Sequence, residues 1–221
     1  EDCILCLPEL GIALLADGMG GHSAGEVASR TAIDTASAIL RQTIRGISPH
    51  ERLETALQAA HSVIREKARH SIRCRGMGTT FVGVLIESGY LHHAHVGDSR
   101  LYLLRYKKVT PLTRDHSLLQ EFVDQGLYSR EEALAKVSRN ILTRALGLEP
   151  HIVIDYDYIK INKGDRFLLC SDGLYDMLSD EEIGLLLNRE HDVEGIALDM
   201  LELANARRST DNVSVIVIAG F

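Results

Sequence analysis

An apolar run that ends in an aspartate and a glycine-rich turn most restricts how this chain can fold. Residues 12–16 are all apolar, and the sequence Asp17-Gly18-Met19-Gly20-Gly21-His22 follows them. The run predicts a short buried strand that delivers the Asp17 carboxylate into a tight turn. The glycines allow the backbone to bend sharply and to approach a ligand closely. A helix is expected to begin at Ser23, because Ser23 and Glu26 have the spacing of a capping box.

Aspartates recur at the ends of other apolar strands. Asp98 and Asp172 each follow an apolar run, while Asp2 and Asp211 each precede one closely. Together with Asp17 they would repel each other strongly, since each pair at about 4 Å costs about 4 kcal/mol at an effective dielectric near 20. Divalent cations make such a cluster tolerable. The pattern therefore predicts a multinuclear metal site, and its oxygen ligands select magnesium or manganese over zinc.

These aspartates belong to motifs that resemble, in order, those of the bacterial PP2C-type (PPM) protein serine/threonine phosphatases. A single motif would be weak, but seven in the same order, from the first residue almost to the last, are specific. The segments that carry the resemblance are Glu1-Asp2, Asp17-Gly18-Met19-Gly20-Gly21-His22, Gly76-Met77-Gly78-Thr79-Thr80, Gly97-Asp98-Ser99-Arg100, Leu142-Thr143-Arg144-Ala145-Leu146-Gly147, Ser171-Asp172-Gly173 and Asp211-Asn212.

The resemblance implies an α+β fold, an α-β-β-α sandwich of two mainly antiparallel sheets flanked by helix pairs, with the metal site between sheet edges. No linker, repeat or low-complexity segment interrupts residues 1–221, which we interpret as a single domain. Periodicity predicts helices at about 23–44, 50–70, 180–188 and 192–206, with short helical pieces within 116–147. The first helix is expected to have a face of small side chains, which includes Ala28, Ala32 and Ala36. Capping boxes are predicted for Ser48 with Glu51, Ser129 with Glu132 and Ser179 with Glu182. Val193 is expected on the inner face of the last helix.

Strands are expected in the segments between these helices. Residues 79–87 are apolar on both faces, which is typical of a strand inside a sandwich, and residues 90–112 are expected to continue from it as a meander. The predicted strands are 3–7, 12–16, 79–87, 90–96, 100–105, 109–112, 152–159, 165–170 and 213–219.

The resemblance also implies roles for individual residues. Asp17 is expected to bridge two Mn²⁺ or Mg²⁺ ions, and the Gly18 carbonyl to add a ligand. Asp172 and Asp211 would complete the first site, and Asp2 the second, so that Asp17, Asp172 and Asp211 carry catalysis. A water shared by both metals has its pKa lowered towards about 7 and can attack phosphorus in line. Asp98, with Asp172, is implied to hold a third, weaker ion.

Two departures from the family pattern concern the substrate. Relatives have a strand and a phosphate-gripping arginine just upstream of the position of Glu1, and this sequence begins at Glu1. Met19 stands where relatives with an Asp-Gly-His sequence have a proposed general-acid histidine. His22 is close by and is expected to contact the substrate.

Several other residues have simpler interpretations. His93 and His95 share a strand face, with His92 between them, but no third ligand at suitable spacing accompanies them, so a packed or solvent-facing strand is favoured over a zinc site. Cys3 and Cys6 lie in an apolar stretch and are expected to be small buried residues. Thr79 and Thr80 are expected to hold strands and turns. Ser171 lacks a histidine motif to activate it as a nucleophile.

Composition restricts the possible partners. The net charge of −7 argues against nucleic acid, and no apolar run approaches the roughly 20 residues that span a bilayer. We expect a cytoplasmic, monomeric protein. The resemblance implies an enzyme that dephosphorylates serine and threonine in proteins and reverses a cognate serine/threonine kinase. The alternatives are a catalytically inactive phosphoprotein-binding module of the same fold and a small-molecule phosphoesterase.

Overall fold

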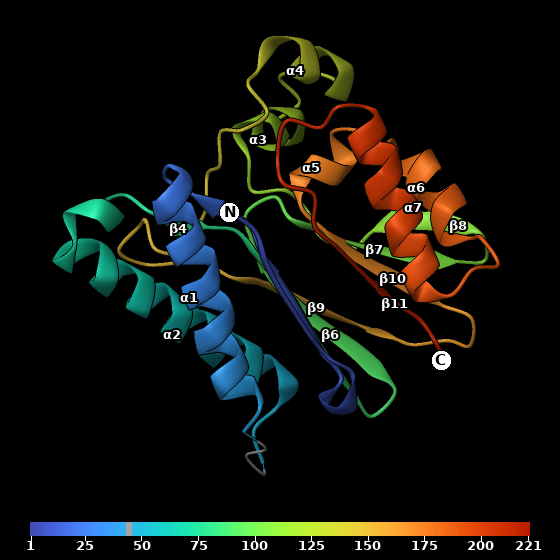
Figure 1. The fold of residues 1–221 in the computed structure, drawn as a ribbon, viewed down its shortest axis with the longest axis horizontal. Coiled ribbons are helices and arrows are strands. Elements are labelled where there is room, and N and C mark those ends of the chain that lie inside the picture. The colour runs from blue at the N-terminus through green and yellow to red at the C-terminus, as the bar shows by residue number, and fades with distance from the viewer. Residues whose placement is uncertain (43–45) are drawn as a thin grey trace.

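A computed structural model describes residues 1–42 and 46–221 and leaves out the side chain of His22. It consists of two antiparallel sheets packed face to face, with helices on both outer faces (Figure 1). This is the predicted α-β-β-α sandwich, and the predicted fold class is confirmed.

The first sheet is covered by two long helices, α1 (His22–Leu40) and α2 (Pro49–His70). The small face predicted for the first helix, which includes Ala28, Ala32 and Ala36, is fully buried and allows α1 to approach the sheet closely. The strands of this sheet lie in the order β1 (Cys3–Leu7), β2 (Ile12–Ala16), β5 (Phe81–Glu87), β6 (Tyr90–Val96) and β9 (Asp155–Lys160).

The second sheet is covered by α5 (Asp172–Tyr175), α6 (Asp180–Leu187) and α7 (Val193–Ala206). A third apolar layer, which includes Leu15, Val84 and Phe167, fills the space between the two sheets. The second sheet has the order β11 (Val215–Ile218), β10 (Arg166–Cys170), β7 (Arg100–Arg105) and β8 (Lys108–Pro111).

The predicted meander through residues 90–112 is wrong in one respect. β6 belongs to the first sheet and β7 to the second, so the chain crosses between sheets at Gly97-Asp98-Ser99. Gly97 has a φ of +99°, and a Cβ there would lie 2.8 Å from the Thr80 side chain, so this crossing requires glycine. The crossing places Asp98 at the edge where both sheets end.

Other predicted boundaries moved by a few residues. The strand predicted at 79–87 is interrupted at Thr80, because β4 (Gly78–Thr79) leaves the sheet to pair with β3 (Gly18–Met19). The strand predicted at 152–159 begins only at Asp155, since Ile152 packs instead into the core beneath α2. The remaining shifts affect strand ends.

Helix caps decide where several helices begin. The Ser23–Glu26 capping box is wrong: α1 begins at His22, and its N-cap Gly21 makes no side-chain hydrogen bond. The first helix ends at Leu40, and its predicted extension to 44 falls partly on residues 43–45, outside the described residues. Val193 is 40% exposed rather than inward. The boxes predicted from Ser48 with Glu51, Ser129 with Glu132 and Ser179 with Glu182 are all present.

The irregular segment at 116–147 contains two short helices, α3 (Leu118–Asp124) and α4 (Arg130–Lys136), as predicted. They lie beside α5 at the upper edge of the sandwich in Figure 1. Within the described residues, no helix has the length and apolar character needed to cross a membrane.

Candidate metal centre

All five predicted aspartates converge at one edge of the sandwich, because each lies where a strand ends or begins. Asp17 joins β2 to β3, Asp98 lies at the crossing between the sheets, and Asp172 follows β10 as the first residue of α5. Asp2 precedes β1, and Asp211 precedes β11.

Asp17 lies at the middle of this cluster. Burial, and then the negative charges of Asp2 and Asp172, raise its pKa to about 10, with a smaller contribution from Asp98. A bound cation would offset the repulsion between these carboxylates. The bridging role that the resemblance implies for Asp17 remains a prediction.

The pKa values of Asp172 and Asp98 are raised as well. Burial and the charges of Asp211 and Asp176 raise the pKa of Asp172 to about 6. Burial and the charges of Asp172 and Asp115 raise the pKa of Asp98 to about 7. Asp211 thus lies near Asp172, and Asp98 lies near both Asp17 and Asp172.

Two oxygen atoms in the cluster test whether cations fit it. Asp2 Oδ1 and Asp172 Oδ1 are buried and have no hydrogen-bond partner among the described residues. Leaving a buried carboxylate oxygen unpaired costs about 1–3 kcal/mol or more. Unpaired hard oxygen donors inside a cluster of acids are what Mg²⁺ or Mn²⁺ requires, so the residues fit the predicted ions.

Hydroxyl groups fix the backbone and side chains of the aspartates. Thr79 Oγ1 donates to the Asp17 carbonyl oxygen at 2.8 Å, and the Asp17 N–H donates to Thr80 Oγ1 at 3.0 Å. Ser171 Oγ donates to Asp2 Oδ2 at 2.8 Å. Thr79 and Thr80 therefore have the supporting role predicted for them, and Ser171 orients an aspartate.

Gly18 packs directly against the first turn of α1. A Cβ on Gly18 would lie 2.1 Å from the Gly25 carbonyl oxygen, and a Cβ on Gly25 would lie 2.7 Å from the Gly18 carbonyl oxygen. Only glycine fits at both positions. This contact brings α1 against the strand end that carries Asp17 and fixes the Gly18 carbonyl; its metal-binding role remains a prediction.

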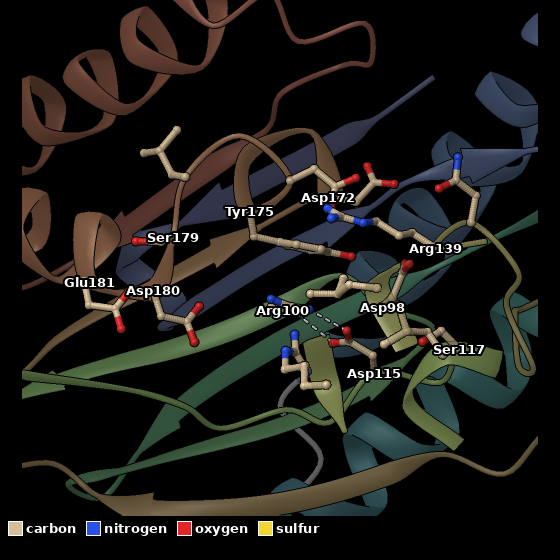
Figure 2. A pocket seen from close by; sticks show the side chains of 16 residues that line it. Asp98, Arg100, Asp115, Ser117, Arg139, Asp172, Tyr175, Ser179, Asp180 and Glu181 are labelled. Atoms are coloured by element: carbon tan, nitrogen blue, oxygen red, sulfur yellow. Dashed lines mark hydrogen bonds and ion pairs between the residues drawn. The ribbon is translucent and has the colours of Figure 1, made fainter. Parts of the chain in front are cut away.

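A cavity of about 300 Å³ extends from Asp98 and Asp172 towards α4 and α6. In Figure 2, the Tyr175 ring reaches from α5 towards Asp98, with Arg100 on one side of it. The Arg100 guanidinium carbon lies 3.6 Å from the centre of that ring, and the nearby Tyr175 hydroxyl partly offsets the rise in the pKa of Asp98. Arg139, from the segment after α4, also lines this cavity and pairs with Asp176 at 3.2 Å.

A second group of possible ligands contains none of the five predicted aspartates. His95 has His116 and Asp155 beside it, which sequence spacing did not reveal. However, Arg144 Nη1 lies 2.8 Å from Asp155 and 3.2 Å from His116, so a guanidinium already supplies the positive charge. The His95 and His116 rings stack on each other, with their centres 4.7 Å apart and an angle of 21° between their planes. We interpret this group as an ion-pair network.

The remaining predictions about single residues can now be placed. His93 is buried in its strand, as expected, and burial lowers its pKa to about 4. The expectation that Cys6 is buried is wrong: Cys3 is half-buried and Cys6 exposed, since residues three apart on a strand face opposite sides. His22 is the first residue of α1, and its side chain lies outside the described residues.

Four residues beside the centre were not identified from the sequence as parts of the site. Asp115, Arg139, Tyr175 and Asp176 line the cavity next to Asp98 and Asp172. Tyr175 and Asp176 follow the Ser171-Asp172-Gly173 motif closely, and that proximity was the available signal. Asp115 directly precedes the irregular segment at 116–147 and Arg139 lies within it, where periodicity carries no information.

Comparisons with known proteins agree with this geometry. The family model described as protein phosphatase 2C matches residues 7–210. The serine/threonine phosphatase Stp of Listeria innocua is 35% identical over 94% of this chain and 83% of its own length. The phosphatase PstP of Mycobacterium tuberculosis is 40% identical over 92% of this chain and 39% of its own length.

Solved structures extend the agreement to three dimensions. The crystal structure of Mycobacterium tuberculosis PstP has a TM-score of 0.90 and 36% identity, covering 98% of this chain and 90% of that one. A PstP catalytic domain with a TM-score of 0.87 and 36% identity, covering 98% and 89% of the two chains, holds two manganese ions, the number of tight ions predicted here. The sequence motifs, the fold and the cluster of aspartates thus agree, and the chain belongs to the PP2C family of protein serine/threonine phosphatases.

Proposed function

We propose that this protein hydrolyses phosphoserine and phosphothreonine in proteins with two Mn²⁺ or Mg²⁺ ions held by its aspartate centre. The observation that carries the proposal is the convergence of five aspartates, two of which have buried, unpaired oxygen atoms. The residues assigned to the ions are Asp2, Asp17, Gly18, Asp172 and Asp211, with Asp17 as the bridging ligand.

The residues of the chain supply position and charge. When bound, the ions supply an activated water for in-line attack and neutralise the phosphoryl oxygens. Asp17 is held by Thr79 and Thr80, and Asp2 by Ser171, so the ligands are oriented before any ion binds. His22, at the start of α1, is proposed to contact the substrate. General acid–base help alone supplies only about 10²–10⁴-fold, far less than phosphate-monoester hydrolysis requires.

The biological setting follows from the substrate class. We propose a cognate serine/threonine kinase as the source of the phosphorylated proteins, and a monomeric, cytoplasmic enzyme. Four free cysteines are compatible with a reducing cytoplasm. The apolar layer shared by the two sheets supports residues 1–221 as a single catalytic domain.

Removal of metal tests the proposal directly. We expect hydrolysis of p-nitrophenyl phosphate and of phosphothreonine peptides to stop in EDTA and to return with Mn²⁺ or Mg²⁺, because every proposed ligand is an oxygen atom. Phosphate release with each metal is the measurement. Full activity after exhaustive chelation, or a preference for zinc, would contradict the mechanism. Activity on the aryl phosphate alone would favour a small-molecule phosphoesterase, and metal binding without turnover would favour an inactive binding module.

Asp98 is proposed to hold a third, weaker ion together with Asp172. We expect Asp98→Ala to keep two tight sites and to lose a weak one in calorimetric titration with Mn²⁺, since an ion with few protein ligands exchanges readily. The kcat on phosphopeptides should fall as well. Unchanged stoichiometry and unchanged kcat would show that Asp98 only caps its turn, through Ser99 and Arg100.

A further inference from the structure

A basic surface lies at the end of α2, in a chain whose net charge is −7. Five of the 24 lysines and arginines lie between residues 65 and 75, together with a single acid, Glu66. The short helix η2 (Ile72–Cys74) carries the chain away from α2, and Ile72 at its start is 92% exposed. We call the exposed residues Arg69, Ile72, Arg73 and Arg75 the basic turn.

The three arginines of the basic turn differ from their neighbours in their bonding. Arg65 Nη1 donates to the Pro150 carbonyl oxygen at 3.0 Å, and Lys67 Nζ donates to Thr31 Oγ1 at 2.9 Å. By contrast, Arg69, Arg73 and Arg75 make no side-chain hydrogen bond or ion pair with any residue that the structure describes. Their charges are therefore free for a partner.

The basic turn leads directly to the aspartate centre. Thr79, which hydrogen-bonds the Asp17 carbonyl, follows Arg75 by four residues, so their Cα atoms lie within about 14 Å. The intervening backbone packs on the glycine turn: a Cβ on Gly20 would lie 2.9 Å from Met77 Cα and 3.2 Å from the Gly76 carbonyl oxygen. In Figure 1 this segment is the blue-green end of α2 at the left, joined to β4 beside the N-terminus.

We propose that the basic turn docks an acidic stretch of the phosphoprotein substrate, in which carboxylates or a second phosphate flank the phosphorylated residue. This inference rests on the proposed function. Guanidinium groups bind carboxylates and phosphates through charge-assisted, bidentate hydrogen bonds, and Ile72 offers an apolar contact among them. An extended peptide advances about 3.3 Å per residue, so acids about four residues from the phosphoresidue can reach Arg75.

The surroundings favour an acidic peptide over a membrane or a nucleic acid. Polybasic membrane segments usually present four to eight clustered basic residues, and the turn has three that are unpaired. The adjacent aspartate centre and the overall charge of −7 would repel an extended anionic surface. A short acidic segment can contact the arginines alone.

Two phosphothreonine peptides of equal length test the proposal, one with glutamates and one with glutamines at the fourth to sixth positions on both sides. We expect the wild-type protein to prefer the acidic peptide by about tenfold in kcat/KM, since each exposed ion pair is weak but three of them act together. The triple variant Arg69→Gln, Arg73→Gln, Arg75→Gln should lose this preference and keep its rate on p-nitrophenyl phosphate. Added salt should also reduce the preference.

A matched control carries the same change of charge at the opposite end of the sandwich. Lys107, Lys108 and Lys163 are exposed there, in turns far along β7 and β10 from Asp98 and Asp172. The triple variant Lys107→Gln, Lys108→Gln, Lys163→Gln should retain the preference for the acidic peptide. An equal loss in both triple variants would mean that net charge, not the basic turn, sets the preference, and would overturn the proposal.

Other outcomes are also decisive. An unchanged preference in the basic-turn variant, or an equal fall on both peptides, would overturn the proposal. Loss of binding to phosphatidylserine vesicles with the peptide preference intact would assign the surface to a membrane instead. If neither peptide is hydrolysed while p-nitrophenyl phosphate is, the proposed function fails. Docking is then judged by inhibition of p-nitrophenyl phosphate hydrolysis by the acidic peptide. The proposal requires stronger inhibition of the wild type than of the basic-turn variant, and equal inhibition would overturn it.

Discussion

Replacement of Asp17 by asparagine is expected to abolish turnover while making the protein more stable in EDTA. Asp17 is half-buried, and burial, followed by the charges of Asp2, Asp172 and Asp98, raises its pKa to about 10. Without cations, the folded state must hold this crowded carboxyl group, so asparagine removes a repulsive contact. The same change removes the proposed bridging ligand, and kcat should fall by more than about a thousandfold.

Thermal unfolding with and without Mn²⁺ separates these two effects. A ligand that binds only the folded state stabilises it in proportion to the logarithm of its concentration over Kd. We therefore expect Mn²⁺ to raise the Tm of the wild type much more than that of Asp17→Asn, although the variant melts higher in EDTA. Asp34→Asn, on the exposed face of α1, is the matched control and should change neither Tm nor rate. A variant that keeps more than a few per cent of kcat would contradict the assignment of Asp17.

The positions of the five aspartates could be predicted because each stands next to an apolar run, Asp2 and Asp211 before one and the other three after one. An apolar run that stops at a carboxylate, next to glycine or serine, identifies a strand end whatever the rest of the chain does. Asp17, Asp98 and Asp172 were found in this way, and the family resemblance supplied their grouping. The caps at Ser48, Ser129 and Ser179 were equally local, and all three are present.

What the sequence did not reveal depends on contacts between distant segments. The crossing at Gly97-Asp98-Ser99 was missed, because β6 and β7 have the same apolar character although they belong to different sheets. The Ser23 box failed because α1 packs so closely on Gly18 that its start is set by this contact. The network of His116 with Asp155 and Arg144 joins residues far apart in sequence, which no spacing rule detects.

Arg100 is expected to be the residue whose loss most destabilises the wall of the cavity. It is 9% exposed, and its Nε and Nη2 donate to the two carboxylate oxygens of Asp115 at 2.8 and 2.6 Å. Its Nη1 donates to the Tyr102 hydroxyl at 2.9 Å, and Tyr102 in turn donates to Asp180 at 2.9 Å. Arg100 thereby links β7 to the irregular segment, to α6 and, through the Tyr175 ring, to α5.

Arg100→Met should reduce the free energy of unfolding by about 3–5 kcal/mol, because it leaves the Asp115 carboxylate, whose side chain is only 11% exposed, without its partner. Arg100→Lys should reduce the free energy of unfolding by a smaller but measurable amount, since an ammonium cannot reproduce the bidentate pair. Arg189→Met is the control: Arg189 pairs with Asp199 at the surface, where an ion pair contributes about 0–1 kcal/mol.

A double variant shows whether the destabilisation arises from the unpaired charge of the Asp115 carboxylate. Arg100→Met combined with Asp115→Leu removes both partners, and we expect it to recover part of the stability that Arg100→Met loses. Denaturant unfolding in EDTA measures all four variants without contributions from bound metal. A cost below about 1 kcal/mol for Arg100→Met, as for an exposed pair, would show that Asp115 finds solvent or another donor. Recovery in the double variant would instead show that Arg100 and Asp115 stabilise this part of the cavity only as an ion pair, because neither residue then contributes without the other.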